Sequence, residues 1–192
     1  MKIELPYNQY MIYISNFIPE QTANEQLRQI HEQVEIAYHP NPMNPKTKLR
    51  RGNAWFSDNE DHIYKYSGTT NNPTPFPPIL AEILEVLRER FEPRLNCCLL
   101  NYYPDGSVGV GPHTDDDFRS NGADIVGVNY GQSRLFRLTD RNTREEVYDL
   151  SLEHGSALVM TAKSQEFFKH EIVKQRKSLG PRLQLSWRGW RD

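Results

Sequence analysis

The chain of 192 residues has few cysteines and no long hydrophobic run. Its two cysteines, Cys97 and Cys98, are neighbours. Adjacent strand residues point to opposite faces, so we expect no bond between them and no disulfide-stapled secreted scaffold. No apolar run approaches the ~20 residues of a membrane span, and the first ten residues lack the pattern of a secretory signal. We therefore expect an intracellular protein with no membrane partner, cytoplasmic or, in a eukaryote, nuclear.

An excess of positive charge is also missing. The formal net charge is −2, which excludes a basic field over the whole molecule but is compatible with a local basic patch. There is no internal repeat and no low-complexity tract. The hydrophobic and charged fractions, 37% and 25%, are those of an ordinary globular protein, and the length suits one domain. We expect a single domain over residues 1–192 that acts as a monomer.

The two halves of the chain differ in residue composition and in the secondary structure that they predict. Residues 11–18 predict a strand, 19–37 and 77–91 predict helices opened by proline, and the proline-rich stretch 38–53 predicts a loop. After Pro93 come seven short segments rich in β-branched and aromatic residues, separated by turn residues, which is typical of a β-sandwich or barrel. The fold class is therefore α+β, mainly β. N-terminal helices and a lid (residues 1–92) pack on an antiparallel core (residues 93–192).

The stretch "PHTDDD" at residues 112–117 allows two interpretations, a solvated acidic turn or half of a metal site. His113 and Asp115 are two apart, so on a strand both side chains point the same way. A third ligand could come from His170, in the later strand-like segment "FFKHEIV". Two imidazoles and one carboxylate form the facial set that holds non-haem Fe(II) and leaves positions open. A histidine on an apolar strand face is more often an ordinary core residue, so this triple alone is a weak signal.

The end of the chain, "PRLQLSWRGW", adds a second signal. Arg182 and Arg188 lie an even number of residues apart, which puts both on one strand face together with Gln184 and Ser186. An arginine on the inward face of a β core needs an anion. That anion could be an internal carboxylate, or the strand could be an edge with its arginines outside. With the metal triple, a small dicarboxylate is the natural partner, because guanidinium groups bind carboxylates bidentately.

The segments "LLNYYPDGS…GPHTDDD", "LEHGSALVMTAKSQEFFKHEI" and "PRLQLSWR" together resemble the AlkB-type Fe(II)/2-oxoglutarate dioxygenases, over residues 50–190. The resemblance implies a double-stranded β-helix (jelly-roll) core and the use of Fe(II), 2-oxoglutarate and O2. It implies that His113, Asp115 and His170 ligate the iron. The residues that match the family's co-substrate contacts are Asn101, Tyr103, Arg182, Gln184, Ser186 and Arg188. Gln184 stands where the family commonly has Asn, and Ser186 where it has Thr.

The same resemblance implies oxidative demethylation of alkylated bases (1-methyladenine or 3-methylcytosine type) in DNA or RNA, with release of succinate, CO2 and formaldehyde. A target base must leave its stack to reach the iron. Matching residues for base contact are Asp117, Tyr64, Tyr66 and Arg51, and Trp55 is a further candidate that could equally be a core residue. Asp116 is expected to be solvated, and the cations between residues 46 and 51 could contact phosphates or simply form a solvated surface.

Two other functions stay open from the sequence. A 2-oxoglutarate-dependent hydroxylase of protein side chains or small molecules would suit the slightly acidic balance. A binding module that keeps the jelly roll without turnover is disfavoured, because all three metal residues and both arginines are present.

Overall fold

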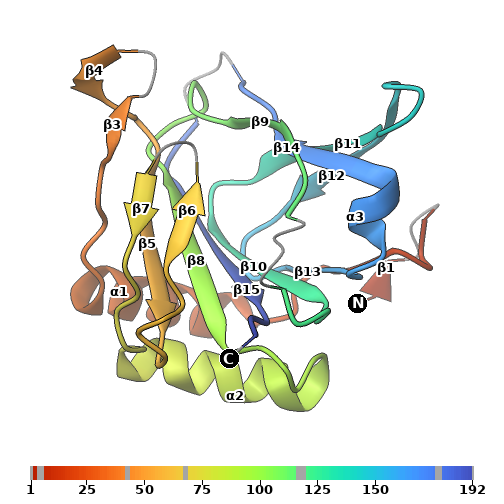
Figure 1. Ribbon diagram of the computed structural model, residues 1–192. Coiled ribbons are helices and arrows are strands. Elements are labelled where there is room, and N and C mark those ends of the chain that lie inside the picture. The colour runs from red at the N-terminus through yellow and green to blue at the C-terminus, as the bar shows by residue number, and fades with distance from the viewer. Residues whose placement is uncertain are drawn as a thin grey trace.

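Two antiparallel sheets dominate the computed structural model, which describes residues 2–3, 7–41, 44–66, 69–115, 120–175 and 179–191 (Figure 1). The larger sheet has seven strands, in the spatial order β1 (Lys2–Ile3), β2 (Met11–Ile14), β13 (Ala157–Met160), β10 (Ile125–Gly131), β15 (Arg182–Arg188), β8 (Cys97–Tyr103), β5 (Gly52–Ser57). The smaller sheet has the order β12 (Glu146–Leu152), β11 (Arg134–Asp140), β14 (Phe168–Ile172), β9 (Val110–His113).

The remaining elements are short hairpins and helices. The hairpins are β3 (Pro40–Asn41) with β4 (Asn44–Lys48), and β6 (Tyr64–Tyr66) with β7 (Thr69–Asn71). The helices are α1 (Glu20–Gln33), α2 (Pro78–Arg90) and the single turn α3 (Ser164–Phe167). The helices α1 and α2 lie side by side beneath the larger sheet, while the smaller sheet lies on its other side (Figure 1).

Strand alternation separates the helix-facing layer from the inner layer. On β15, the buried Leu183, Leu185 and Trp187 join the core formed with α1 and α2. The residues between them point to the other face of the sheet, because successive strand side chains alternate. That inner face carries apolar residues such as Tyr103 and Met160, which join one core with Phe136 from the smaller sheet. The polar positions 182, 184, 186 and 188 of β15 are therefore directed between the two sheets.

The fold class is confirmed, and each of the seven strands expected after Pro93 is present. Both cysteines are free and buried. The first half holds more strand than expected. The strands β2 and β5 are hydrogen-bonded members of the larger sheet. That sheet therefore combines strands from both sides of residue 92. The expected loop at 38–53 contains β3 and β4, and the helix expected to residue 37 ends at Gln33, because Val34 has extended backbone (φ −117°, ψ 124°).

Among the described residues, the helices are all too short or too polar to span a bilayer.

Candidate active site

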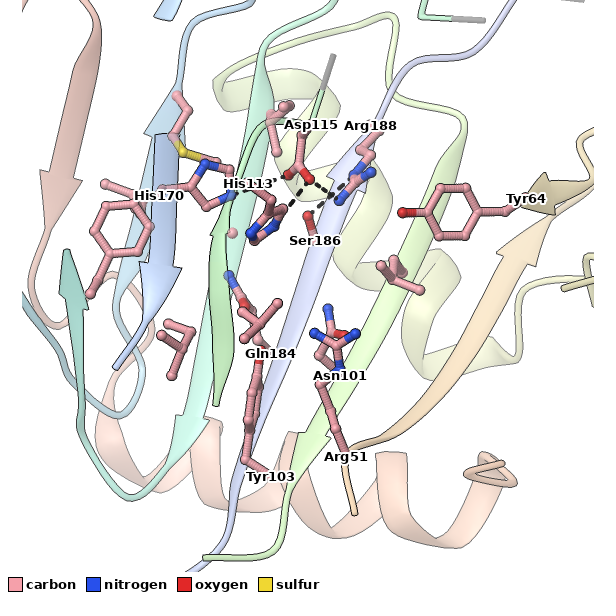
Figure 2. Close-up of a pocket in the computed structure, with 18 residues that line it drawn as sticks. Arg51, Tyr64, Asn101, Tyr103, His113, Asp115, His170, Gln184, Ser186 and Arg188 are labelled. Carbon is pink, nitrogen blue, oxygen red and sulfur yellow. Dashed lines mark hydrogen bonds and ion pairs between the residues drawn. The ribbon is translucent and has the colours of Figure 1, made fainter. Parts of the chain in front are cut away.

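Three side chains form a metal-binding constellation between the sheets. His113 ends β9 and His170 lies in β14, and the two residues face each other directly across the strand pair. Asp115 follows two residues after His113. Its Oδ1 is 3.6 Å from His113 Nε2, and its Oδ2 is 3.6 Å from His170 Nε2 (Figure 2). One ligand atom from each residue lies within 4.8 Å of the others, which suits the facial two-histidine, one-carboxylate set of non-haem Fe(II).

Hydrogen bonding and charge prepare these groups as ligands. His113 Nδ1 lies 2.9 Å from the carbonyl oxygen of Gly111. A carbonyl can only accept, so Nδ1 donates and Nε2 keeps a free lone pair toward the metal. Burial lowers the pKa of His170 to about 4, so its ring is neutral at pH 7. Burial opposes ionisation of Asp115, but the positive charge of Arg188 is the largest opposing effect, and the pKa of that carboxyl is lowered. This donor set fits a divalent iron.

Two further residues hold the ligands in place, and neither was a candidate from the sequence. Gln165 accepts a hydrogen bond from the Asp115 backbone N–H at 2.9 Å and donates to Ser164 Oγ at 3.0 Å. The ring of Phe136 stacks on the His170 ring at 5.6 Å between centroids. Both residues restrict the ligands before any metal binds.

The larger sheet supplies the second wall. On β15, Arg188 Nη2 lies 2.9 Å from Asp115 Oδ1, and Arg188 Nε donates to Ser186 Oγ at 3.4 Å (Figure 2). Gln184 pairs across the strands with Asn101 of β8, and Arg182 pairs with Tyr103. Both arginines face inward, so the outward-edge alternative is wrong. Arg188 does form an internal ion pair, with the metal carboxylate itself.

Arg182 has the properties of a dicarboxylate anchor. The residue is almost fully buried, and the guanidinium lies over the Tyr103 ring, 5.1 Å from its centroid. Nη2 donates to Asn129 Oδ1 at 2.6 Å. Nε is buried without a hydrogen-bond partner among the described residues. Burial lowers the pKa of Arg182 to about 10, so the cation would gain from a carboxylate. The residues present thus fit 2-oxoglutarate as well as iron.

An aromatic group borders the same pocket. Tyr64 lines it, with its hydroxyl directed toward Arg188 (Figure 2), and Arg188 Cζ is 5.7 Å from the ring centroid. Trp55 stacks on Tyr64 at 4.8 Å and contacts Trp190 at 4.9 Å. Trp55 Nε1 donates to the His62 carbonyl at 2.6 Å. Trp55 therefore supports Tyr64 from outside the pocket lining.

Most of the residues expected from the sequence meet in this pocket. Those that line it are Arg51, Tyr64, Asn101, Tyr103, His113, Asp115, His170, Gln184, Ser186 and Arg188. Arg182 adjoins Gln184, and Trp55 lies behind Tyr64. Asp116 and Asp117 lie outside the described residues, as does the side chain of Tyr66. The expected base contacts of Asp117 and Tyr66 therefore stay predictions.

Two buried polar residues, Asn129 and His62, were not among the candidates from the sequence. Asn129 on β10 was not a candidate, yet it is buried and joins Arg182 to Ser156, whose Oγ accepts from Asn129 Nδ2 at 3.2 Å. His62 is buried, and its Nδ1 is 2.7 Å from Ser57 Oγ. A signal for Asn129 did exist, since it is the polar position in an otherwise apolar strand.

Comparison with known proteins gives the same picture. The model of the 2OG-Fe(II) oxygenase superfamily matches residues 10–188. The chain is 31% identical over 133 residues to the mouse (Mus musculus) DNA oxidative demethylase ALKBH2, an alignment covering 65% of this chain and 56% of that protein. It is 28% identical over 180 residues to the uncharacterized protein R406 of Acanthamoeba polyphaga mimivirus, covering 92% and 91%. The chain thus spans little more than half the length of its ALKBH2 relative.

A solved structure, described as the structure of OsALKBH1, superposes with a TM-score of 0.67 at 17% identity, covering 98% of this chain and all of that one. This likeness supports the fold alone. The family model, in contrast, covers nearly the whole chain and includes every residue of the triad and both arginines. The similarity to ALKBH2 supports the resemblance to the AlkB type, and the chain belongs to the 2OG-Fe(II) oxygenase superfamily, whose dioxygenases use Fe(II), 2-oxoglutarate and O2.

Proposed function

We propose that this protein is an oxidative demethylase of N-alkylated nucleobases, of the 1-methyladenine and 3-methylcytosine type, in DNA or RNA. The observation that carries the proposal is that aromatic and cationic side chains lie at the same pocket as the His–Asp–His triad. Tyr64, backed by Trp55, and the cation Arg51 come from the segment before the core and lie at the same pocket. A flat aromatic face beside a cation is what an unstacked base and its phosphate require. The name of the ALKBH2 relative supports the same substrate class.

The residues divide into three roles in this proposal. His113, Asp115 and His170 hold the iron, and Arg182 with Asn101 and Tyr103 anchors 2-oxoglutarate. When bound, iron, 2-oxoglutarate and O2 hydroxylate the N-methyl group, 2-oxoglutarate leaves as succinate and CO2, and the hydroxymethyl group leaves the base as formaldehyde. The chain supplies orientation and exclusion of water.

The third role is recognition of the base. Tyr64 offers a stacking surface, which Trp55 and Trp190 hold rigid from behind. The exposed Lys46 and Lys48 of β4 and Arg51, which directly precedes β5, form a local basic segment suited to phosphates despite the net charge of −2. In this proposal residues 38–71 serve as the recognition lid. Asp117 would face the exocyclic amine or the positive charge of the alkylated ring.

The test is coupled product formation. Succinate and formaldehyde are measured with Fe(II), ascorbate and 2-oxoglutarate, with single- and double-stranded DNA and RNA carrying 1-methyladenine or 3-methylcytosine. We expect both products to rise together with at least one methylated strand and not with its unmethylated counterpart. Succinate at a basal rate that no oligonucleotide stimulates would instead favour the hydroxylase of proteins or small molecules.

A matched pair of variants tests the aromatic wall. Tyr64→Leu should raise the KM for the methylated strand about tenfold, because base–aromatic stacking contributes ~1–3 kcal/mol per base. Tyr148→Leu removes a partly buried tyrosine from β12, away from the pocket, and should leave that KM unchanged. Equal KM values for the two variants would remove Tyr64 from base recognition.

A further inference from the structure

One inward position of β10 carries no side chain. Ile125, Gly127 and Asn129 alternate with Val126 and Val128, which face the helices, so Gly127 faces the pocket. Its backbone is not in the positive-φ region that the structure records for Gly122, Gly131 and Gly155. Any L-residue could therefore adopt its backbone conformation, and the reason for glycine here is space.

The space at Gly127 is filled by the end of Gln184. A Cβ on Gly127 would lie 3.1 Å from Gln184 Nε2 and 3.6 Å from the carbonyl oxygen of Leu158. The first distance is inside the ~3.5 Å of ordinary van der Waals contact. Gln184 is on the neighbouring strand β15, where Ser186 pairs with Gly127 and Gln184 pairs with Asn129. Gln184 and Gly127 are thus fitted to each other by size.

The orientation of the Gln184 amide follows from its neighbour Arg182. Arg182 Nη1 lies 3.5 Å from Gln184 Oε1, and a guanidinium can only donate, so the amide oxygen faces Arg182. The amide nitrogen then lies over Gly127. Among the described residues, no acceptor takes a hydrogen bond from this nitrogen. Gln184 lines the pocket, and its neighbour Arg182 has a buried Nε without a hydrogen-bond partner among the described residues.

We propose that Gly127 is a specificity-determining residue for the 2-oxo acid co-substrate. By leaving room for Gln184 Nε2, it lets the amide donate to the distal carboxylate beside Arg182, and the pair Gly127–Gln184 sets the length of diacid that fits. This inference depends on 2-oxoglutarate binding and is independent of the nucleic-acid substrate, so failure of the demethylase proposal leaves it intact.

The experiment measures co-substrate affinity without turnover. The dissociation constant of 2-oxoglutarate is determined by calorimetry on protein loaded with redox-inert Mn(II). Gly127→Ala should weaken binding about tenfold, the loss expected for one charge-assisted hydrogen bond. Its thermal midpoint should not fall, because alanine restricts the unfolded chain more than glycine does. Gly180→Ala adds the same methyl group where the nearest atom, Gln132 Cβ, is 4.0 Å away, and should leave the affinity unchanged.

The coupling with Gln184 decides the mechanism. Gln184→Asn withdraws the amide by about one C–C bond, ~1.5 Å. In that background Gly127→Ala should change the dissociation constant by less than about threefold, since the two sites then no longer touch. Gln184→Asn should also improve the affinity for 2-oxoadipate, one methylene longer, relative to 2-oxoglutarate. If Gly127→Ala has no effect, or the same effect in both backgrounds, or if the preference for diacid length stays constant, the proposal is overturned.

Discussion

The pair formed by Arg188 and Asp115 should be the most costly contact to break in the metal-free protein. Arg188 Nη2 lies 2.9 Å from Asp115 Oδ1, and the two side chains are 8% and 6% exposed. Burial disfavours the charged form of Arg188, yet the carboxylate outweighs burial and raises the pKa of Arg188 above its ordinary value. Arg188→Met keeps much of the apolar stem and removes the charge, which leaves a buried carboxylate without its cation. Losing one partner of a buried pair costs about 3–5 kcal/mol.

Protonation of Asp115 limits that cost and gives it a pH dependence. Neutralising a carboxyl of ordinary pKa ~3.9 at pH 7 costs about 4 kcal/mol, and at pH 5 about 1.5 kcal/mol. Because the folded-state pKa of Asp115 is lowered, its pairing stabilises the protein above the unfolded-state pKa and is lost as pH falls through the folded-state pKa. We expect Arg188→Met to lose about 3–4 kcal/mol of unfolding free energy at pH 7 and about 1.5 kcal/mol or less at pH 5.

The assay is urea unfolding of metal-free protein at the two pH values, followed by tryptophan fluorescence and circular dichroism. Arg137→Met is the matched control. Arg137 Nε is 2.8 Å from Asp149 Oδ1 and Arg137 Nη1 is 2.6 Å from Glu146 Oε1, but both acids are exposed. Its loss should cost less than about 1 kcal/mol. A deficit for Arg188→Met below that of the control at pH 7, or one that grows toward pH 5, would refute the reasoning.

Three further predictions follow from the same contacts. Asp115→Asn keeps an oxygen near Arg188 but loses the ligand charge, so Mn(II) titration should show affinity reduced by more than about 100-fold with unchanged circular dichroism; retained affinity would remove Asp115 from the metal set. Asn129→Asp puts a permanent carboxylate on Arg182, so calorimetry should show 2-oxoglutarate bound at least about tenfold more weakly; unchanged affinity would contradict the role of Arg182 as the anchor. Leu87→Ala, at a fully buried site of α2, should cost about 2–5 kcal/mol in urea unfolding while the metal affinity per folded molecule stays constant.

Local pattern alone predicted much of the fold and site. The strands after Pro93 alternate side chains with period two, and this period indicates which residues share a face. It therefore grouped Arg182, Gln184, Ser186 and Arg188 before any partner was known. The same period predicted that His113 and Asp115 could bind one metal ion. Which side chains of a strand share a face depends on the covalent geometry of the backbone, so it does not depend on the partners that the strand finds on folding.

The first half was harder to predict, because its short strands depend on distant partners. The strand β5 pairs with β8, some 45 residues later, and β2 pairs with β13, near residue 158. The hairpin of β3 and β4 holds three prolines over residues 40–45, a composition that locally favours a loop. The helix α1 ends earlier than its apolar spacing suggested, since Val34 continues as extended chain toward the bridge between Ala37 and Asn53.

What the sequence determined by itself is therefore the chemistry of the ligands: which residue types occur, at which spacing, on which face of a strand. What only the tertiary structure decided is how residues from separate strands complete one another. Asn129 orients Arg182, and Gly127 leaves the volume that Gln184 occupies. These relations depend on the packing of β10 against β15. The two strands are more than 50 residues apart in the sequence, so no local sequence pattern predicts how much space their side chains leave each other.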